Sequence, residues 1–184
     1  KHCRTDPRLQ PVPRTLSETL SKSRILAVRQ CRRRLWLETR RPDLRIYGAD
    51  AQRRFAQGAQ LNALVRRLYP DGRLIHEATG TTDALELTRS HLARSPGRRL
   101  FEAAFSRHRV LVRADIFRRT TDGFELTEIK SSTRVKGHHL LDCAVQNWVI
   151  SEAGYPVART LLAHIDTRFN YRGDGDYTGL LRHV

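Results

Sequence analysis

In three consecutive segments of residues 100–130 the spacing of apolar residues shifts towards a period of two, and this pattern restricts the possible folds more than any other feature. The segments are 100–105, 110–117 and 124–130, and Thr121-Asp122-Gly123 separates the last two. A period of two is typical of β-strands whose two faces differ in burial, and a short glycine-containing turn joins the strands of a hairpin. The sequence therefore predicts three consecutive, hairpin-linked strands.

Segments with helical spacing of apolar residues lie on both sides of these strands. The first runs from a cap at Ser21 or Ser23 to a point before Pro42, and its apolar positions are Ile25, Val28, Cys31 and Leu35. Further helices are expected over about 51–69, from Asp83 in the capping-box-like Asp83-Ala84-Leu85-Glu86, and over 139–153, with a last strand over 160–165. The tail beyond Arg168 is expected to be loop.

This order of elements predicts an α/β fold with a mixed central sheet of about four strands, flanked by helices and preceded by an N-terminal helical region. With 184 residues, 39% of them hydrophobic, the chain can bury one substantial core. We expect residues 21–184 to form a single domain and residues 1–20 to be a poorly ordered lead-in. Because the chain starts at Lys1 and has no methionine, it is also interpreted as a fragment of a longer protein.

The charge of the chain indicates a polyanionic partner. Lys and Arg number 34 against 19 Asp and Glu, which gives a formal net charge of +15. Guanidinium groups match phosphate oxygens in geometry, so DNA is the expected partner, although an arginine-biased composition would explain any single arginine pair. No apolar run approaches the ~20 residues of a membrane helix. We therefore expect no membrane partner and a cytoplasmic location.

The third predicted strand combines a carboxylate and an ammonium group on one face. Alternation places Glu128 and Lys130 together and Ile129 on the opposite face. Asp115 lies near the end of the preceding strand, where hairpin pairing would bring it beside Glu128. Two adjacent carboxylates repel unless a cation lies between them, and Mg²⁺ (or Mn²⁺) prefers oxygen ligands such as two carboxylates and the Ile129 carbonyl. The sequence thus predicts a magnesium site.

Asp115 followed by the Glu128-Ile129-Lys130 strand resembles the signature of the PD-(D/E)XK nuclease superfamily. Ser21-Lys22-Ser23-Arg24-Ile25-Leu26, followed by residues 30–37, is similar to the N-terminal helix of RecB-type nucleases and their CRISPR-associated exonuclease relatives. Residues 101–105 and 112–115 are similar to strands of that group. The resemblance covers roughly residues 21–165 and implies a restriction-endonuclease-like core.

The resemblance also implies roles for individual residues. Asp115 and Glu128 would bind the metal, and Lys130 would orient or activate the attacking water. Glu102 would be either a third acidic ligand or a strand residue paired with an arginine. Gln146, on the following helix, would contact DNA or a water in the catalytic site. Nucleic-acid contacts are further expected at Ser131, Ser132, Arg134, Lys136 and Arg113.

The chain departs from these relatives in several places. Their Gln-x-x-x-Tyr pattern is broken at Ile150, and residues 55–62 lack the histidine that many of them carry. Cys31 occupies the first place of a four-cysteine iron–sulfur set, but no cysteine follows Cys143, so no cluster is expected and Cys31 is interpreted as a small buried helix residue. His139 and Cys143, one helical turn apart, lack the remaining ligands of a zinc site.

Three functions are consistent with these features. The first is a metal-dependent deoxyribonuclease that hydrolyses phosphodiester bonds in DNA repair, recombination or phage defence. The alternative is a catalytically inactive, nuclease-fold DNA-binding module of a larger protein, which metal-dependent cleavage would discriminate. A basic RNA-associated protein would need exposed aromatic platforms, whereas Trp36 and Trp148 are expected to be core residues on helices. The strand preference, polarity and oligomeric state are left open.

Overall fold

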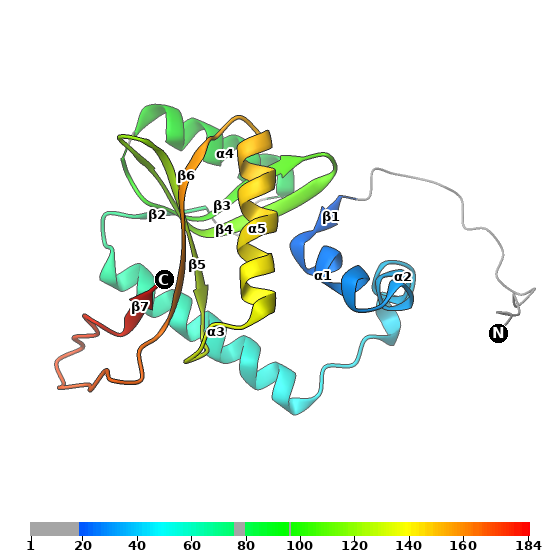
Figure 1. Ribbon diagram of the computed structural model, residues 1–184, viewed down its shortest axis with the longest axis horizontal. Helices are drawn as coiled ribbons and strands as arrows, with labels where there is room; N and C mark the ends of the chain where they lie inside the picture. Colours follow the sequence, from blue (N-terminus) through cyan, green and yellow to red (C-terminus); the bar gives the residue numbers. More distant parts are fainter. Residues whose placement is uncertain (1–18, 76–79, 96) are drawn as a thin grey trace, which may run out of the picture.

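A computed structural model describes residues 19–75, 80–95 and 97–184, and shows a mixed α/β fold (Figure 1). One curled seven-stranded sheet has the order β2-β3-β4-β5-β6-β7, and β1 pairs with β4 outside this path. In chain order the elements are β1 (Leu20–Ser21), α1 (Lys22–Gln30), α2 (Arg32–Arg40), the 3-10 helix η1 (Pro42–Leu44), α3 (Ala49–Leu68), β2 (Arg73–Leu74), α4 (Thr81–Arg94), β3 (Leu100–Arg107), β4 (Val110–Thr120), β5 (Gly123–Lys130), α5 (Gly137–Glu152), β6 (Val157–Ile165) and β7 (Leu181–His183).

The predicted meander is confirmed. β3, β4 and β5 pair consecutively and antiparallel, and α5 then leads to β6, which pairs parallel with β5. The turn between β4 and β5 requires glycine, because Gly123 has a φ of 136° and a Cβ there would approach the Pro156 carbonyl oxygen to 2.8 Å. The register of this hairpin fixes which residues of β4 and β5 meet.

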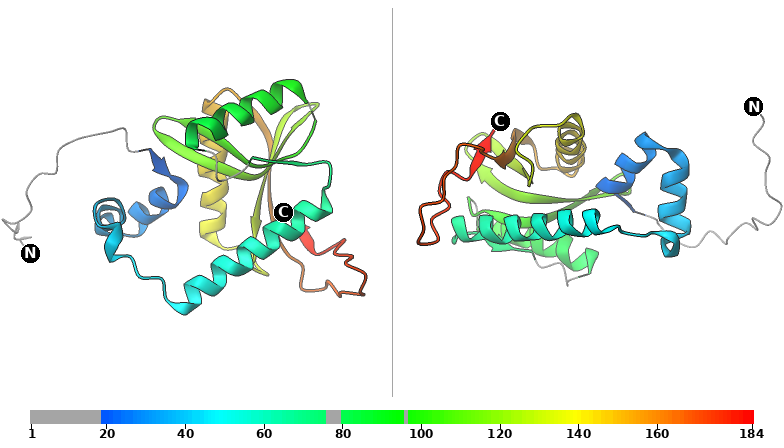
Figure 2. Two further views of the ribbon diagram at one scale, coloured as in Figure 1. Left: turned by 180° about the vertical axis from the view of Figure 1, so that it is seen from behind. Right: turned by 90° about the horizontal axis from the view of Figure 1, so that it is seen from below.

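The sheet lies between two helical layers. Figure 2 shows α5 on one face and α3 and α4 on the other. On the α5 side, Val149 and Ile150 pack into a core cluster with strand residues such as Phe117 and Leu126. On the opposite side, α3 contributes Leu61 and Val65 to a second cluster, with Phe101, Ile116, Ile129 and Ala163. Both faces of β4 and β5 are therefore covered by helices, so most of the polar residues of these two strands have little access to solvent.

The expected number of about four strands is wrong, because three short strands extend the sheet. β1 and β2 have two residues each, and β7 has three and lies in the tail predicted to be loop. Segments this short carry no period-two pattern, and their conformation follows from pairing with β4, β3 and β6. Most of the predicted lead-in lies outside the described residues, although Leu20 belongs to β1.

The single helix predicted from Ser21 towards Pro42 is instead two helices. Ser21 does cap α1, since its Oγ accepts a hydrogen bond from the Arg24 N–H at 3.4 Å. Cys31 then adopts an extended conformation, with φ −165° and ψ 124°, so that α2 starts in a new direction. α2 has no buried residue, and Cys31 is exposed. The interpretation of Cys31 as a buried core residue is therefore wrong.

Two further expectations about helices are corrected. Trp36 and Trp148 are each 46% exposed and so are not core residues, because α2 lies beyond the sheet and Trp148 is on an outer face of α5. The capping box at Asp83 is not formed, since α4 begins at Thr81 and Glu86 pairs with Arg89 instead. In both cases the sequence pattern predicted a helical segment correctly, but it did not show which other residues the helix contacts.

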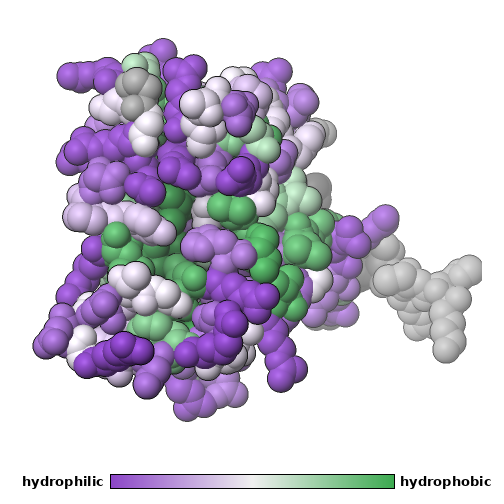
Figure 3. Space-filling model, turned by 60° about the vertical axis from the view of Figure 1, so that its left-hand side comes forward, coloured by the Kyte–Doolittle hydropathy of each residue, from purple (hydrophilic) through white to green (hydrophobic). Residues whose placement is uncertain are grey.

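The surface of the chain is mixed in character. On the face in Figure 3, hydrophilic residues occupy the upper and lower parts, and hydrophobic residues form a band between them. Within the described ranges, no helix combines the length and apolar character needed to cross a bilayer.

Candidate active site

Three acidic residues meet where β4 and β5 separate. The pairing of these strands ends at Ile116 and Thr127, so Asp115 and Glu128 are the first residues beyond the paired region. On the other side of β4, the pairs Phe101–Ile116 and Ala103–Ala114 leave Glu102 opposite Asp115. Three neighbouring strands thus each present one carboxylate at the same level of the sheet.

The pleat of the sheet is irregular at this level. Residues on one face of a strand are normally separated by an even number of positions. Leu100 and Ala103 on β3 nevertheless lie in the same core cluster, as do Ala114 and Phe117 on β4. Between the first pair, Glu102 has a left-handed φ of 57°, a conformation that costs about 1–3 kcal/mol for a non-glycine residue. Such strain clusters at functional sites, where the surrounding structure maintains it.

Glu128 is the centre of a buried hydrogen-bond network. Its Oε1 accepts from Lys22 Nζ and Lys130 Nζ, both at 2.7 Å, and its Oε2 accepts from Gln146 Nε2 at 2.6 Å. The Glu128 side chain is only 3% exposed. A carboxylate at this depth needs charged or hydrogen-bonding partners, because its desolvation is otherwise unfavourable. The three partners fix the direction in which the carboxylate points.

The N-terminal strand explains how Lys22 reaches this network from 106 positions away. β1 pairs parallel with the start of β4, through Leu20–Val110 and Ser21–Leu111. α1 begins directly after β1, so its first residue lies near the end of β5. The Lys22 ammonium can therefore contact Glu128 although the two residues are distant in sequence.

Asp115 is anchored by the main chain of β5. Its Oδ2 accepts a hydrogen bond from the Ile129 N–H at 2.7 Å. In a β-strand the N–H and C=O of one residue point to the same side, so the Ile129 carbonyl also faces β4. Burial raises the pKa of Asp115 well above its usual value, and the charges of Glu128 and Glu102 raise it further. A cation near this carboxylate would relieve that repulsion.

Two residues of helix α5, which covers one face of the sheet, belong to the same network. Lys130 Nζ donates to Asp142 as well as to Glu128, and Gln146, four residues after Asp142, donates to both the Asp142 carbonyl and Glu128. Burial alone would lower the pKa of Lys130, but the charge of Glu128 and the contact with Asp142 outweigh it and raise the pKa. Lys130 is therefore an ammonium group at neutral pH and cannot accept a proton from water.

The charges of the site leave room for a divalent cation. Burial raises the pKa of Glu128, but Lys22 and Lys130 outweigh it, so the net shift is downward. In the same network, the carboxylates of Asp115, Glu128 and Asp142 lie beside the ammonium groups of Lys22 and Lys130. A divalent cation would offset the repulsion between Asp115 and Glu128.

Few protein ligands are available at this site, so a magnesium ion bound there would keep several waters. In the part of the chain that the structure describes, no group of three or more His, Cys, Asp or Glu side chains is arranged to hold a metal. The protein ligands would therefore be Asp115, Glu128 and the Ile129 carbonyl, with water and substrate oxygens completing the shell. Nearby, Asp142 Oδ1 and Gln146 Oε1 are buried without a hydrogen-bond partner, and water molecules would satisfy them.

The remaining residues that the sequence suggested for the site lie either in buried positions beside the network or in the loop between β5 and α5. Gln146 has no exposed surface, so it orients Glu128 and does not offer an amide to DNA directly. Arg113, two residues before Asp115, has a buried Nη1 without a partner. The other predicted nucleic-acid contacts lie in the β5–α5 loop directly after Lys130, and they are Ser131, Ser132, Arg134 and Lys136. Within this loop, Ser132 Oγ donates a hydrogen bond to the Arg134 carbonyl.

Sequence reasoning assigned no role to three residues of the network: Lys22, Asn62 and Asp142. Asn62 Nδ2 lies 3.4 Å from Glu102 Oε1, and it comes from the α3 segment that lacks the relatives' histidine. A signal for Asp142 was available, since it precedes Gln146 by one helical turn and shares its face. For Lys22 the only signal in the sequence was its place at the start of a helix, and this does not reveal that its partner is Glu128, 106 residues away.

A buried histidine beside the site predicts a pH effect on stability. His139 is 4% exposed, its Nδ1 accepts from the Lys136 N–H, and burial together with the Lys130 charge lowers its pKa to about 4. Because this folded-state pKa lies below the usual 6.5, the stabilising effect is complete above about pH 6.5 and is lost as the pH falls towards 4.

His139→Asn keeps an acceptor near the Nδ1 position but does not titrate. Between pH 7 and pH 5 the wild type should therefore lose about 2 kcal/mol of unfolding free energy relative to this variant. Urea unfolding of both proteins at the two pH values measures the difference. Equal losses in the two proteins would show that His139 is not buried in its neutral form.

Comparisons with known proteins assign no family to the chain. The sequence matches no family model and no curated protein. A solved structure described as "Crystal structure of SSO0001" is similar at a TM-score of 0.40 and 16% sequence identity, covering 96% of this chain and 70% of that one. Similarity at this level is too low to support a fold or a function.

Proposed function

We propose that this chain is a metal-dependent DNA nuclease that hydrolyses phosphodiester bonds. The observation that supports it most is the position of Asp115 and Glu128 at the divergence of β4 and β5, with the protonated Lys130 held beside them. The proposal includes a restriction-endonuclease-like core made of the β3–β5 meander, α5 and β6, to which the short strands are additions. Intact acidic and lysine positions favour an enzyme over an inactive binding module.

The residues of the site can perform distinct parts of phosphodiester hydrolysis. A bound Mg²⁺ would polarise the phosphate and lower the pKa of a bound water. Asp115 is held for ligation by the Ile129 N–H, and Glu128 by Gln146. Lys130, protonated between Glu128 and Asp142, places a positive charge where negative charge develops on the attacked phosphate. The positive net charge of the chain would attract DNA to this site.

Cleavage assays with a matched pair of variants test this proposal. Linear and circular DNA, single- and double-stranded, would be incubated with the wild type, Lys130→Ala and the control Arg89→Ala in Mg²⁺, Mn²⁺ or chelator. Arg89 is an exposed residue of α4 that pairs with Glu86, so its variant should cut like the wild type. We expect cleavage only with metal, and a decrease on the order of 10²-fold for Lys130→Ala. Binding without cleavage in every metal would favour the inactive module instead.

A further inference from the structure

The segment formed by α2, η1 and the start of α3 extends away from the sheet (Figure 1). α2 and η1 contain no buried residue, and the apolar side chains that they and the following loop carry are largely uncovered. Ile46 is 92% exposed, Phe55 58% and Tyr47 42%. A helix without a buried face is not stabilised by a core of its own, so this segment is suited to being covered by a ligand.

Two aromatic residues of this segment, Tyr47 and Phe55, pack against each other at its surface. The Tyr47 and Phe55 rings meet edge to face with centroids 5.2 Å apart, and the Arg45 guanidinium lies 4.6 Å from the Tyr47 ring centroid. Arginine and aromatic planes exposed in this way are the surfaces on which unpaired bases stack. Base stacking is tolerant of sequence, because every base has a π face.

The charge of the same segment favours a polyanion over a protein partner. Residues 31–55 contain eight arginines and three acidic residues. Each of these acidic residues already has an arginine partner, in the pairs Glu38–Arg34, Asp43–Arg41 and Asp50–Arg53. The arginine excess is therefore not neutralised within the segment, and guanidinium groups suit phosphate oxygens.

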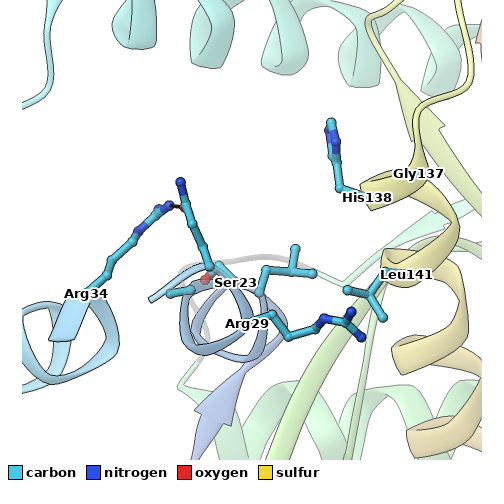
Figure 4. Close-up of a pocket in the computed structure, with 9 residues that line it drawn as sticks. Ser23, Arg29, Arg34, Gly137, His138 and Leu141 are labelled. Atoms are coloured by element: carbon cyan, nitrogen blue, oxygen red, sulfur yellow. Dashed lines mark hydrogen bonds between the residues drawn. The ribbon is translucent and has the colours of Figure 1, made fainter. Parts of the chain in front are cut away.

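Two neighbouring pockets lie between this surface and the side of the molecule that carries the candidate active site. The first, about 670 Å³, opens between α1, α2 and the start of α5, and Figure 4 shows Ser23 and Arg34 on one side and His138 on the other. It starts next to the catalytic network, since Ser23 follows Lys22 and Leu141 precedes Asp142. The second, about 430 Å³, is lined by Arg33, Arg41 and Arg45 among others. Arg34 lines both pockets, so the two are neighbours on this surface.

We propose that the surface from α1 to the start of α3 is a binding track for a single-stranded nucleic acid, with bases stacked on Tyr47 and Phe55 and phosphates bound by the arginines. A duplex cannot stack its paired bases on this surface, so the track discriminates single strands from duplexes. The inference concerns binding, and it stands whether or not the metal site cleaves DNA.

Binding of fluorescent oligonucleotides in chelator tests the track without interference from cleavage. The probes are oligothymidine, oligouridine and a DNA duplex, and the proteins are the wild type, the double variant Tyr47→Ala/Phe55→Ala and the control Trp148→Ala. Trp148 is 46% exposed, between the values of Tyr47 and Phe55, but stacks on His108, away from the track. We expect the double variant to bind single strands about tenfold more weakly and the duplex and control affinities to change less than twofold.

The two single-stranded probes distinguish DNA from RNA as the ligand, and tighter binding of either by the wild type than by the double variant supports the track. Thermal unfolding verifies that the double variant is folded. We expect it to fold, because both replaced side chains are exposed. Unchanged binding in the double variant, or an equal loss for single strands and duplex, would overturn the inference and point to a protein partner for this surface.

Discussion

Replacing Asp115 with asparagine should abolish metal-dependent DNA cleavage and leave the fold at least as stable as the wild type. The amide oxygen can still accept the hydrogen bond from Ile129 N–H, but the proposed metal ion would lose a charged ligand. Metal ions supply several kcal/mol of transition-state stabilisation, so a loss on the order of 10³-fold is expected. The stability expectation follows from the repulsion that raises the Asp115 pKa, because a neutral side chain removes it.

The size of this stability effect depends on pH. A group whose folded-state pKa is raised stabilises the protein at low pH, and the effect is lost as the pH rises. In metal-free buffer, Asp115→Asn should therefore gain stability over the wild type as the pH rises towards neutrality. Cleavage rates and urea unfolding are measured beside Asp122→Asn, a change in the exposed β4–β5 turn that should alter neither. Cleavage at the wild-type rate by Asp115→Asn would exclude Asp115 as a metal ligand.

Replacing Glu128 with alanine should destabilise the protein by about 3 kcal/mol, the lower end of the range for removing one member of a buried ion pair. The variant leaves the Lys22 and Lys130 ammonium groups without their carboxylate, and their side chains keep only 23% and 19% exposure. Glu128→Gln retains an amide oxygen that can accept hydrogen bonds from both lysines, so this variant should lose less stability than Glu128→Ala. Both variants should lose cleavage, because the amide and the methyl group are poor magnesium ligands.

Urea unfolding in metal-free buffer separates this stability effect from metal binding. The control is Glu86→Ala, which removes an exposed carboxylate paired with Arg89 and should change stability by less than about 1 kcal/mol. If Glu128→Ala were no less stable than this control, the two lysines would not depend on Glu128, and the buried network would have to be rejected.

The central part of the fold was predictable from the sequence because its signals are local. The alternation in β4, the short apolar-rich segments of β3 and β5 and the glycine turn at Gly123 define a meander, and the register of a two-strand hairpin brings Asp115 towards Glu128. The pairing of Glu128 with Lys130 on one face follows from alternation alone. The short strands β1 and β7 carry no such signal, since they exist only through pairing with β4 and β6.

The remaining features depend on contacts between distant segments. Lys22 joins the site because β1 pairs with β4, which no local pattern indicates. Cys31 was predicted to lie on a buried helix face because of its spacing, and Trp36 was expected in the core, but spacing does not reveal whether any element lies against that face. α2 extends past the sheet, so these residues are exposed. The same exposure is the basis for the proposed nucleic-acid track.

Anomalous scattering from crystals soaked in Mn²⁺ tests the metal site most directly. The account predicts one strong peak between β4 and β5, within about 2.1 Å of carboxylate oxygens of Asp115 and Glu128 and near the Ile129 carbonyl. The same peak should be absent from crystals of Asp115→Asn. A peak elsewhere, or none at saturating Mn²⁺ in the wild type, would contradict the assignment of these two carboxylates as the centre of a metal-dependent nuclease.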